Sequence, residues 1–156
     1  MRIHSVLVLL TIALVASLPV WAQSGTCTPA SGVLITNIGA IDGVYNLGPV
    51  FGDLQGSVAA KIVSVNPDGT YTLQHYWVTT AGATILMNPA ILKPTYPTTD
   101  KNIVAVPWGH YSSDINGGTG AFTGATGTIN YFGMADFNKS TLVLRYSGTV
   151  CYKQAQ

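Results

Sequence analysis

The feature that most constrains the fold of this chain is a series of short, strand-like segments separated by turn residues. Thr, Val, Ile, Tyr and Gly dominate these segments, and none of them shows the roughly 3.6-residue apolar period of an amphipathic helix. The pattern predicts strands at residues 33–38, 57–65, 70–80, 83–87, 102–111, 125–135 and 141–152. About seven or eight closely spaced strands without crossover helices favour an antiparallel barrel or sandwich.

The connections between these segments carry recognisable turn chemistry. Asn66, Pro67, Asp68 and Gly69 form a hairpin signal, since proline presets φ and glycine supplies a left-handed position. Residues 88–100 contain three prolines and are predicted to form one long loop, because proline cannot donate to a central ladder. Loops of this length are often functional.

The first 22 residues have the composition of a cleavable signal peptide. Arg2 precedes an apolar run of eleven residues from Val6 to Ala16, and the leader ends in a small residue, Ala22. Cleavage is predicted between Ala22 and Gln23. The apolar run is too short for a membrane span, which needs roughly 20 residues. We therefore expect a secreted or periplasmic protein with a single barrel domain at residues 23–156 and no membrane span after processing.

The predicted mature chain carries almost no charge with which to recognise a charged partner. Without Arg2, six Lys and Arg residues stand against six Asp, so the net charge is zero, and no Glu occurs. Charged residues make up 8% of the chain, against about 25% in an average globular protein. This composition lacks the basic stripe that nucleic-acid binding requires and the polybasic patch that anionic lipids attract.

Two cysteines lie near the two ends of the mature chain. In an oxidising compartment Cys27 and Cys151 are most simply explained as one structural disulfide. Closing so long a loop contributes roughly 4–5 kcal/mol in the chain-entropy model. The alternative, a redox or metal-binding pair, lacks a Cys-x-x-Cys spacing.

The stretch GGTGAFTGATGTINYFG, residues 117–133, contains six glycines. It does not match a phosphate-binding loop, because no lysine follows the glycines and the next residues alternate as a strand instead of opening a helix. The glycines are better explained as a hairpin turn with bulges, followed by a strongly bent strand.

The same stretch resembles a signature of dirigent proteins and the wider group of allene-oxide-cyclase-like barrels. The pattern GGTG-x-F-x-x-A-x-G, also written GGTGxFxGATG in secreted bacterial relatives, places glycines at Gly117, Gly118, Gly120, Gly124 and Gly127. The resemblance implies an eight-stranded antiparallel barrel with a hydrophobic central cavity, often assembled as a trimer. Plant members of the group steer phenoxyl-radical coupling or cyclise a fatty-acid epoxide without a cofactor.

The catalytic part of that resemblance does not carry over to this chain. The active members use acids in the cavity, whereas here Glu is absent and five of the six Asp residues lie beside turn residues, where Asp normally supports the backbone. The sixth, Asp53, is also expected to be structural. The sequence leaves open whether any reaction is catalysed. A cofactor-free isomerisation, cyclisation or dirigent-like steering is the form it would take.

Two predicted strands each carry a histidine two residues from a tryptophan. Alternation places Tyr71, His75 and Trp77 on one face of the first strand, and Trp108 and His110 on one face of the second. If both faces point into the barrel, these five residues line one end of a pocket. Under the alternative interpretation, both tryptophans pack in the core and each histidine is hydrogen-bonded at a rim.

The function that these observations favour is binding of a small hydrophobic, aromatic or phenolic ligand in the barrel. The competing hypothesis is a non-catalytic structural or interaction protein of the cell envelope that uses the outside of the barrel. No metal site is predicted, because only two histidines remain after processing and zinc takes roughly three or four protein ligands.

Overall fold

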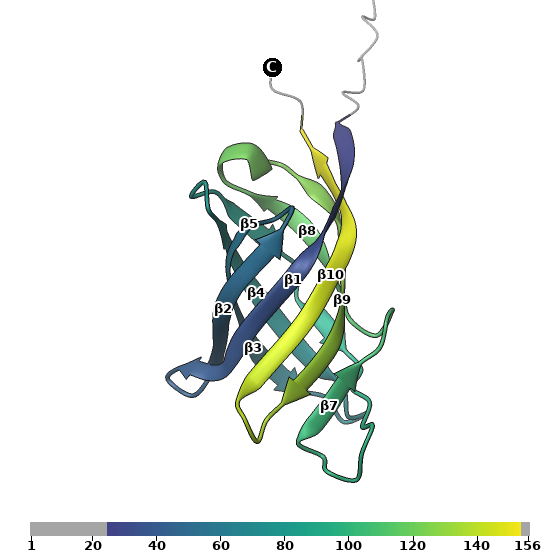
Figure 1. Ribbon diagram of the computed structural model, residues 1–156. Helices are drawn as coiled ribbons and strands as arrows, with labels where there is room; N and C mark the ends of the chain where they lie inside the picture. The colour runs from purple at the N-terminus through teal and green to yellow at the C-terminus, as the bar shows by residue number, and fades with distance from the viewer. Residues whose placement is uncertain (1–24, 154–156) are drawn as a thin grey trace, which may run out of the picture.

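The computed structural model describes residues 25–153, an all-β structure with one short 3-10 turn (Figure 1). The strands are, in chain order, β1 (Thr26–Ile41), β2 (Tyr45–Gly52), β3 (Gly56–Val65), β4 (Tyr71–Thr79), β5 (Thr84–Met87), β6 (Ala90–Leu92), β7 (Ile103–Val106), β8 (Ser112–Gly118), β9 (Thr126–Asp136) and β10 (Thr141–Tyr152), with the turn η1 at Gly120–Phe122. Within residues 25–153, no helix is long and apolar enough to cross a membrane.

The ten strands form one closed antiparallel barrel. The hydrogen-bonded order is β10-β1-β2-β3-β4-β5-β8-β9, and β9 pairs again with β10, which completes the ring. β5 and β6 follow one another along β4, and β7 and β8 follow one another along β9. Each of these pairs fills one position, so the ten strands occupy eight positions around the barrel. The predicted all-β, eight-stranded antiparallel barrel is confirmed.

The barrel closes where the first strand meets the last. β1 and β10 pair in continuous register from Thr26 opposite Tyr152 to Asn37 opposite Thr141. Cys27 lies directly opposite Cys151 in this register, and the two form the predicted disulfide. Since these strands come from the two ends of the described chain, the covalent link fixes the seam of the barrel.

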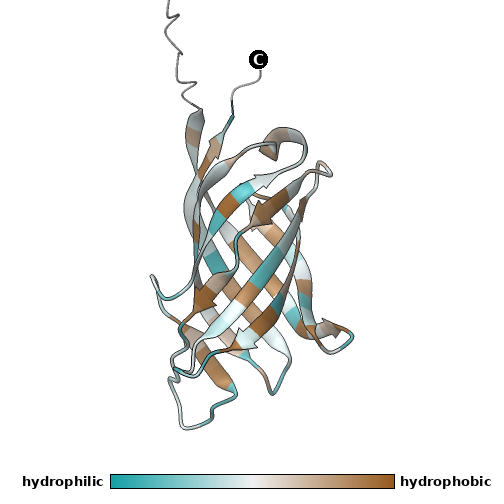
Figure 2. Ribbon diagram, turned by 180° about the vertical axis from the view of Figure 1, so that it is seen from behind, coloured by the Kyte–Doolittle hydropathy of each residue, from teal (hydrophilic) through white to brown (hydrophobic). Residues whose placement is uncertain are grey.

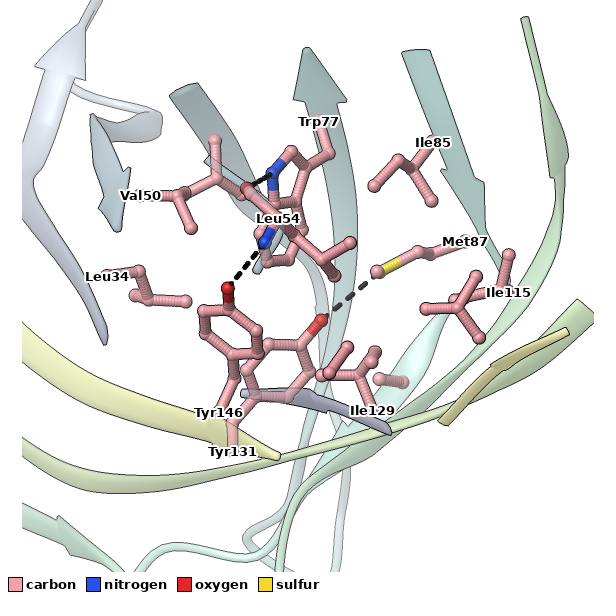
Figure 3. Close-up of a cluster of buried hydrophobic side chains, with 14 of the residues drawn as sticks. Leu34, Val50, Leu54, Trp77, Ile85, Met87, Ile115, Ile129, Tyr131 and Tyr146 are labelled. Carbon is pink, nitrogen blue, oxygen red and sulfur yellow. Dashed lines mark hydrogen bonds between the residues drawn. The ribbon is translucent and has the colours of Figure 1, made fainter. Parts of the chain in front are cut away.

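The interior is built from every second residue of the strands. In Figure 2 hydrophobic and hydrophilic residues alternate along the strands, as expected where one sheet face is buried and the other solvated. A cluster of buried side chains in the core includes Trp77, Tyr146 and Leu54 (Figure 3). There Trp77 Nε1 donates to the Leu54 carbonyl at 3.2 Å, and the Leu54 amide donates to the Tyr146 hydroxyl at 2.9 Å.

All seven predicted strands contain strand structure, but three further strands were not predicted. β2 contains Gly48 and Pro49, β6 lies inside the proline-rich loop predicted at residues 88–100, and β8 is mostly polar. Each of them departs from the apolar alternation that marks a strand. Their pairing is set by neighbouring strands, which supply the hydrogen-bonding partners regardless of composition.

The glycine-rich stretch ends one strand and begins the next, as predicted. β8 ends with Gly117 and Gly118, and the turn η1 follows it. Phe122, the last residue of η1, is buried. In β9, Gly127 has a φ of +137°, and a side chain there would collide with the carbonyl oxygen of Thr149 on β10. Glycine is therefore required where these two strands approach closely.

The structural role expected for Asp53 also agrees with the structure. Its Oδ2 accepts hydrogen bonds from the Ser31 amide at 2.8 Å and from the Ser31 hydroxyl at 3.2 Å. These contacts join the segment after β2 to β1. The carboxylate thus supports the backbone at the end of the barrel that carries the disulfide.

Candidate ligand-binding cavity

A cavity of about 340 Å³ occupies the end of the barrel opposite the disulfide. Its lining includes residues from the turn between β1 and β2 and from the segment that joins β9 to β10, at the lower end of the barrel in Figure 1. The volume lies at the small end of the range for ligand pockets, which starts at roughly 300 Å³. The barrel interior is thus divided into a packed half and a hollow half.

Aliphatic side chains form most of the cavity wall. Leu34, Val58, Leu73, Val104 and Leu144 all line it and are buried. They come from five different strands, and each occupies an inward position of the two-residue alternation. None of the residues that line the cavity is Asp, Lys or Arg. The wall is therefore suited to an apolar ligand.

His75 is a buried polar residue in the lining of this cavity. Its side chain is 5% exposed, and its Nε2 lies 2.5 Å from the hydroxyl of Tyr111, which also lines the cavity. Its ring stacks on Tyr131, with centroids 5.1 Å apart and an angle of 20° between the planes. The Tyr131 hydroxyl in turn donates to the Met87 sulfur at 3.1 Å. These contacts fix the position of the imidazole.

Burial sets the protonation states of this cluster. It lowers the pKa of His75 to about 4, because the charged imidazolium loses its hydration without gaining an anionic partner. Burial also raises the pKa of Tyr111 well above its ordinary value, and the neighbouring Tyr131 adds to this effect. Near neutral pH, His75 is therefore an uncharged imidazole and Tyr111 an uncharged phenol.

Two residues that line the cavity each have a buried polar side-chain atom without a hydrogen-bond partner among residues 25–153. The two atoms are His75 Nδ1 and Thr36 Oγ1. Thr36 is 3% exposed and lies on β1, whereas His75 lies on β4, and both line the cavity. Buried polar groups are nearly always paired in native proteins, so these two atoms call for an explanation.

The structure brings only part of the predicted residue set to the cavity. Tyr71 and His75 line it. Trp77 lies on the same face of β4, but its indole is 1% exposed and packs in the core against Tyr146, outside the lining. For Trp77 the core interpretation describes the observed position.

The prediction that Trp108 and His110 share the pocket is wrong in its geometry. β7 ends at Val106, and a turn closed by the His110 amide on the Pro107 carbonyl follows it. The alternation therefore stops before Trp108, which is 58% exposed and packs edge-on against Phe132. His110 is half-buried beside the Lys93 carbonyl and does not line the cavity.

Sequence reasoning missed Thr36 and Tyr111 as cavity residues. Thr36 lies in a predicted strand, on the same face as the apolar residues Leu34 and Ile38. This shared face was the available indication that the Thr36 side chain points inward. Tyr111 was included in a predicted strand, but a turn precedes it. The turn interrupts the alternation of inward and outward side chains, so the direction of the Tyr111 side chain could not be predicted from the strand before it.

A second depression, of about 480 Å³, lies at the opposite end of the barrel. It is lined mainly by the turn segments after β2, β4 and β8 and is widely open to solvent. Its side chains include Asp53, whose carboxylate is already occupied by Ser31. This depression lies between turns on the surface and is much less enclosed than the apolar cavity.

Comparisons with known proteins identify no family for this chain. No family model matches it, and no curated protein matches it. Among solved structures it is similar to a pterocarpan synthase dirigent protein, at 14% sequence identity and a TM-score of 0.38, over 92% of this chain and 98% of that one. The function of the protein has therefore to be inferred from its own residues.

Proposed function

We propose that this protein binds a small apolar or aromatic molecule in the cavity at the open end of the barrel. The observation that carries the proposal is an apolar cavity of about 340 Å³, two of whose lining residues have a buried polar atom without a partner in the described chain. Small-molecule sites combine these features: mostly apolar walls and a few polar groups that fix orientation.

The cavity also favours ligand binding over the competing hypothesis of a structural or interaction protein. A structural or interaction protein of the cell envelope would use the outside of the barrel and needs no internal space. A barrel interior filled by side chains would have favoured that hypothesis. Here only one half of the interior is filled, so ligand binding has the better support.

The proposal concerns binding, with catalysis as a secondary possibility of the same site. An efficient proton carrier has a pKa near the working pH. Burial lowers the pKa of His75 to about 4, which leaves it a weak base at neutral pH. If the bound molecule reacts, we expect the wall to act by holding one conformation of it, as in a cofactor-free isomerisation or dirigent-like steering.

We further propose that the protein works outside the cytoplasm. The disulfide between Cys27 and Cys151 supports this, because such bonds persist in oxidising compartments. The predicted leader and its cleavage position between Ala22 and Gln23 lie outside the described residues.

Fluorescence titration with N-phenyl-1-naphthylamine tests the binding proposal. This uncharged dye emits strongly only in apolar surroundings. Ala60 lines the cavity, whereas its neighbour Ala59 pairs with the exposed Tyr76 on the outer face. We expect enhanced, blue-shifted emission with the wild-type protein and with Ala59→Phe, and little with Ala60→Phe, because a phenyl group at position 60 occupies the cavity.

The two alanine variants form a matched pair because they add the same side chain at adjacent positions of β3. Thermal unfolding checks that both are folded. Equal enhancement by all three proteins would place the dye outside the cavity and contradict the proposal, as would the absence of enhancement by any of them.

A further inference from the structure

The contact between His75 and Tyr111 determines which imidazole nitrogen carries the proton. Burial keeps Tyr111 protonated, so its O–H needs an acceptor. Among the described residues, the only hydrogen-bond partner of this hydroxyl is His75 Nε2. If Tyr111 donates to Nε2, the neutral ring carries its proton on Nδ1. The reverse arrangement would leave the Tyr111 proton without an acceptor as well as Nδ1 without a donor, so it is disfavoured.

This assignment gives a residue of the cavity wall a hydrogen-bond donor without an acceptor. Nδ1–H of His75 is buried and finds no acceptor among residues 25–153. Thr36 Oγ1, also buried and without a partner there, carries a rotatable hydroxyl that can donate too. An acceptor atom on a ligand would satisfy donors that are otherwise desolvated without compensation.

The wall provides nothing that would neutralise a charged ligand. No Lys or Arg lines the cavity, and the only histidine there is uncharged near neutral pH. A carboxylate held against these aliphatic side chains would lose its hydration without gaining a counter-ion, which is strongly unfavourable. The acceptor therefore belongs to an uncharged group.

Building on the proposed binding function, we propose that the cavity selects uncharged apolar molecules that carry a carbonyl oxygen. The oxygen accepts a hydrogen bond from Nδ1–H of His75, and the Thr36 hydroxyl is available as a second donor. The aliphatic wall holds the rest of the molecule. Ketones, aldehydes and esters belong to this class, whereas free carboxylates and hydrocarbons of the same shape do not.

Three probes of equal size and nearly equal shape test this selectivity. They are 2-acetylnaphthalene, 2-isopropenylnaphthalene and 2-naphthoate, which present a ketone, an alkene and a carboxylate on the same ring system. Calorimetric titration of the wild-type protein near neutral pH should show the ketone binding about tenfold more tightly than the alkene, the effect of one net hydrogen bond. The carboxylate should bind more weakly than the ketone by at least the same factor.

Variants assign this preference to the wall. Thr36→Val keeps the shape of the side chain and removes its hydroxyl, so the ratio of ketone to alkene affinity should fall. His75→Phe should remove the larger part of the preference, since only the Thr36 hydroxyl then remains as a donor. Nitrogen-resolved NMR of the wild-type imidazole gives a check that needs no variant: the proton should reside on Nδ1.

The outcomes separate this inference from the proposed function on which it rests. If the alkene binds as tightly as the ketone, or the carboxylate binds most tightly, the selectivity is wrong while the binding cavity stands. A proton on Nε2 would overturn the selectivity in the same way. If none of the three probes binds and the naphthylamine dye does not bind either, the cavity is not a binding site and both proposals fail.

Discussion

His75 is held by packing and one hydrogen bond, without an ionic partner. Tyr111 contacts its Nε2 and Tyr131 stacks on its ring, and both are themselves uncharged phenols at neutral pH. The imidazole is therefore stable in this position only in its neutral form. Protonation of this single residue should therefore change the free energy of unfolding of the protein.

Stability should rise with pH between about 4 and 6.5 because of His75. Its pKa is lowered from 6.5 to about 4 on folding, so in this window the unfolded chain binds a proton that the folded protein does not. The free energy of unfolding should therefore be about 3 kcal/mol larger at neutral pH than below pH 4. This gain is lost progressively as the pH falls toward 4. Urea unfolding at several pH values measures it.

His75→Phe is the comparison for this pH dependence. The variant should be less stable at neutral pH, since Tyr111 loses its hydrogen-bond partner, but the slope between pH 4 and 6.5 should largely disappear. Equal slopes in the two proteins would show that other groups are responsible.

At the residue scale, sequence reasoning found the cavity only in part. Tyr71 and His75 were identified because the alternation of β4 continues without interruption. Thr36 was not singled out, because its place on a strand face with Leu34 and Ile38 indicates an inward direction but no role in binding. Its significance depends on the missing hydrogen-bond partner, which is a property of the folded protein.

At the scale of elements, the predictions failed where a strand is interrupted. Residues 102–111 were predicted as one strand, but the chain leaves the sheet after Val106 and returns near Tyr111. Pro107 and Gly109 are turn signals that indicate the interruption. Periodicity cannot be extended across such a turn, so the faces of Trp108 and His110 were assigned incorrectly.

The close approach of β9 and β10 gives a prediction at the same scale. Gly127→Ala should destabilise the protein by at least about 2 kcal/mol, because its Cβ would collide with the Thr149 carbonyl and its φ disfavours a residue with a Cβ. Chemical denaturation measures the change.

The matched control for this variant is Gly69→Ala in the turn between β3 and β4. Gly69 also has a positive φ, +80°, but nothing lies within 4 Å of a Cβ there. The Gly69→Ala variant should lose only the conformational penalty of a non-glycine residue at positive φ, about 1–2 kcal/mol of unfolding free energy. A loss for Gly127→Ala no larger than that of Gly69→Ala would contradict a steric role for the approach of the two strands.

On the scale of the whole molecule, strand-forming composition and regular turns were sufficient to predict an antiparallel barrel. The division of its interior into a packed half and a hollow half was not predictable. It depends on how far Trp77, Tyr146 and Phe122 fill one end, and on whether the smaller side chains at the other end meet across the barrel. The volume of a cavity depends on three-dimensional packing and produces no periodic pattern in the sequence.

The export proposal also concerns the whole molecule. When the full-length chain is expressed with its own leader, the product should leave the cytoplasm, begin at Gln23 and contain no free thiols, because Cys27 and Cys151 are joined. Intact mass and thiol titration of the fractionated protein measure this. A cytoplasmic product that retains residue 1, or one with two free thiols, would contradict it.

The central claim is that the hollow half of the barrel is a binding site, and a crystal structure of the protein with 2-acetylnaphthalene tests it most directly. The account predicts electron density for the probe inside the cavity, among Tyr71, Leu73 and Leu144, with its carbonyl oxygen within hydrogen-bond distance of His75 Nδ1. Density for the probe only on the outer face of the barrel, or a cavity closed by side chains in the crystal, would contradict it.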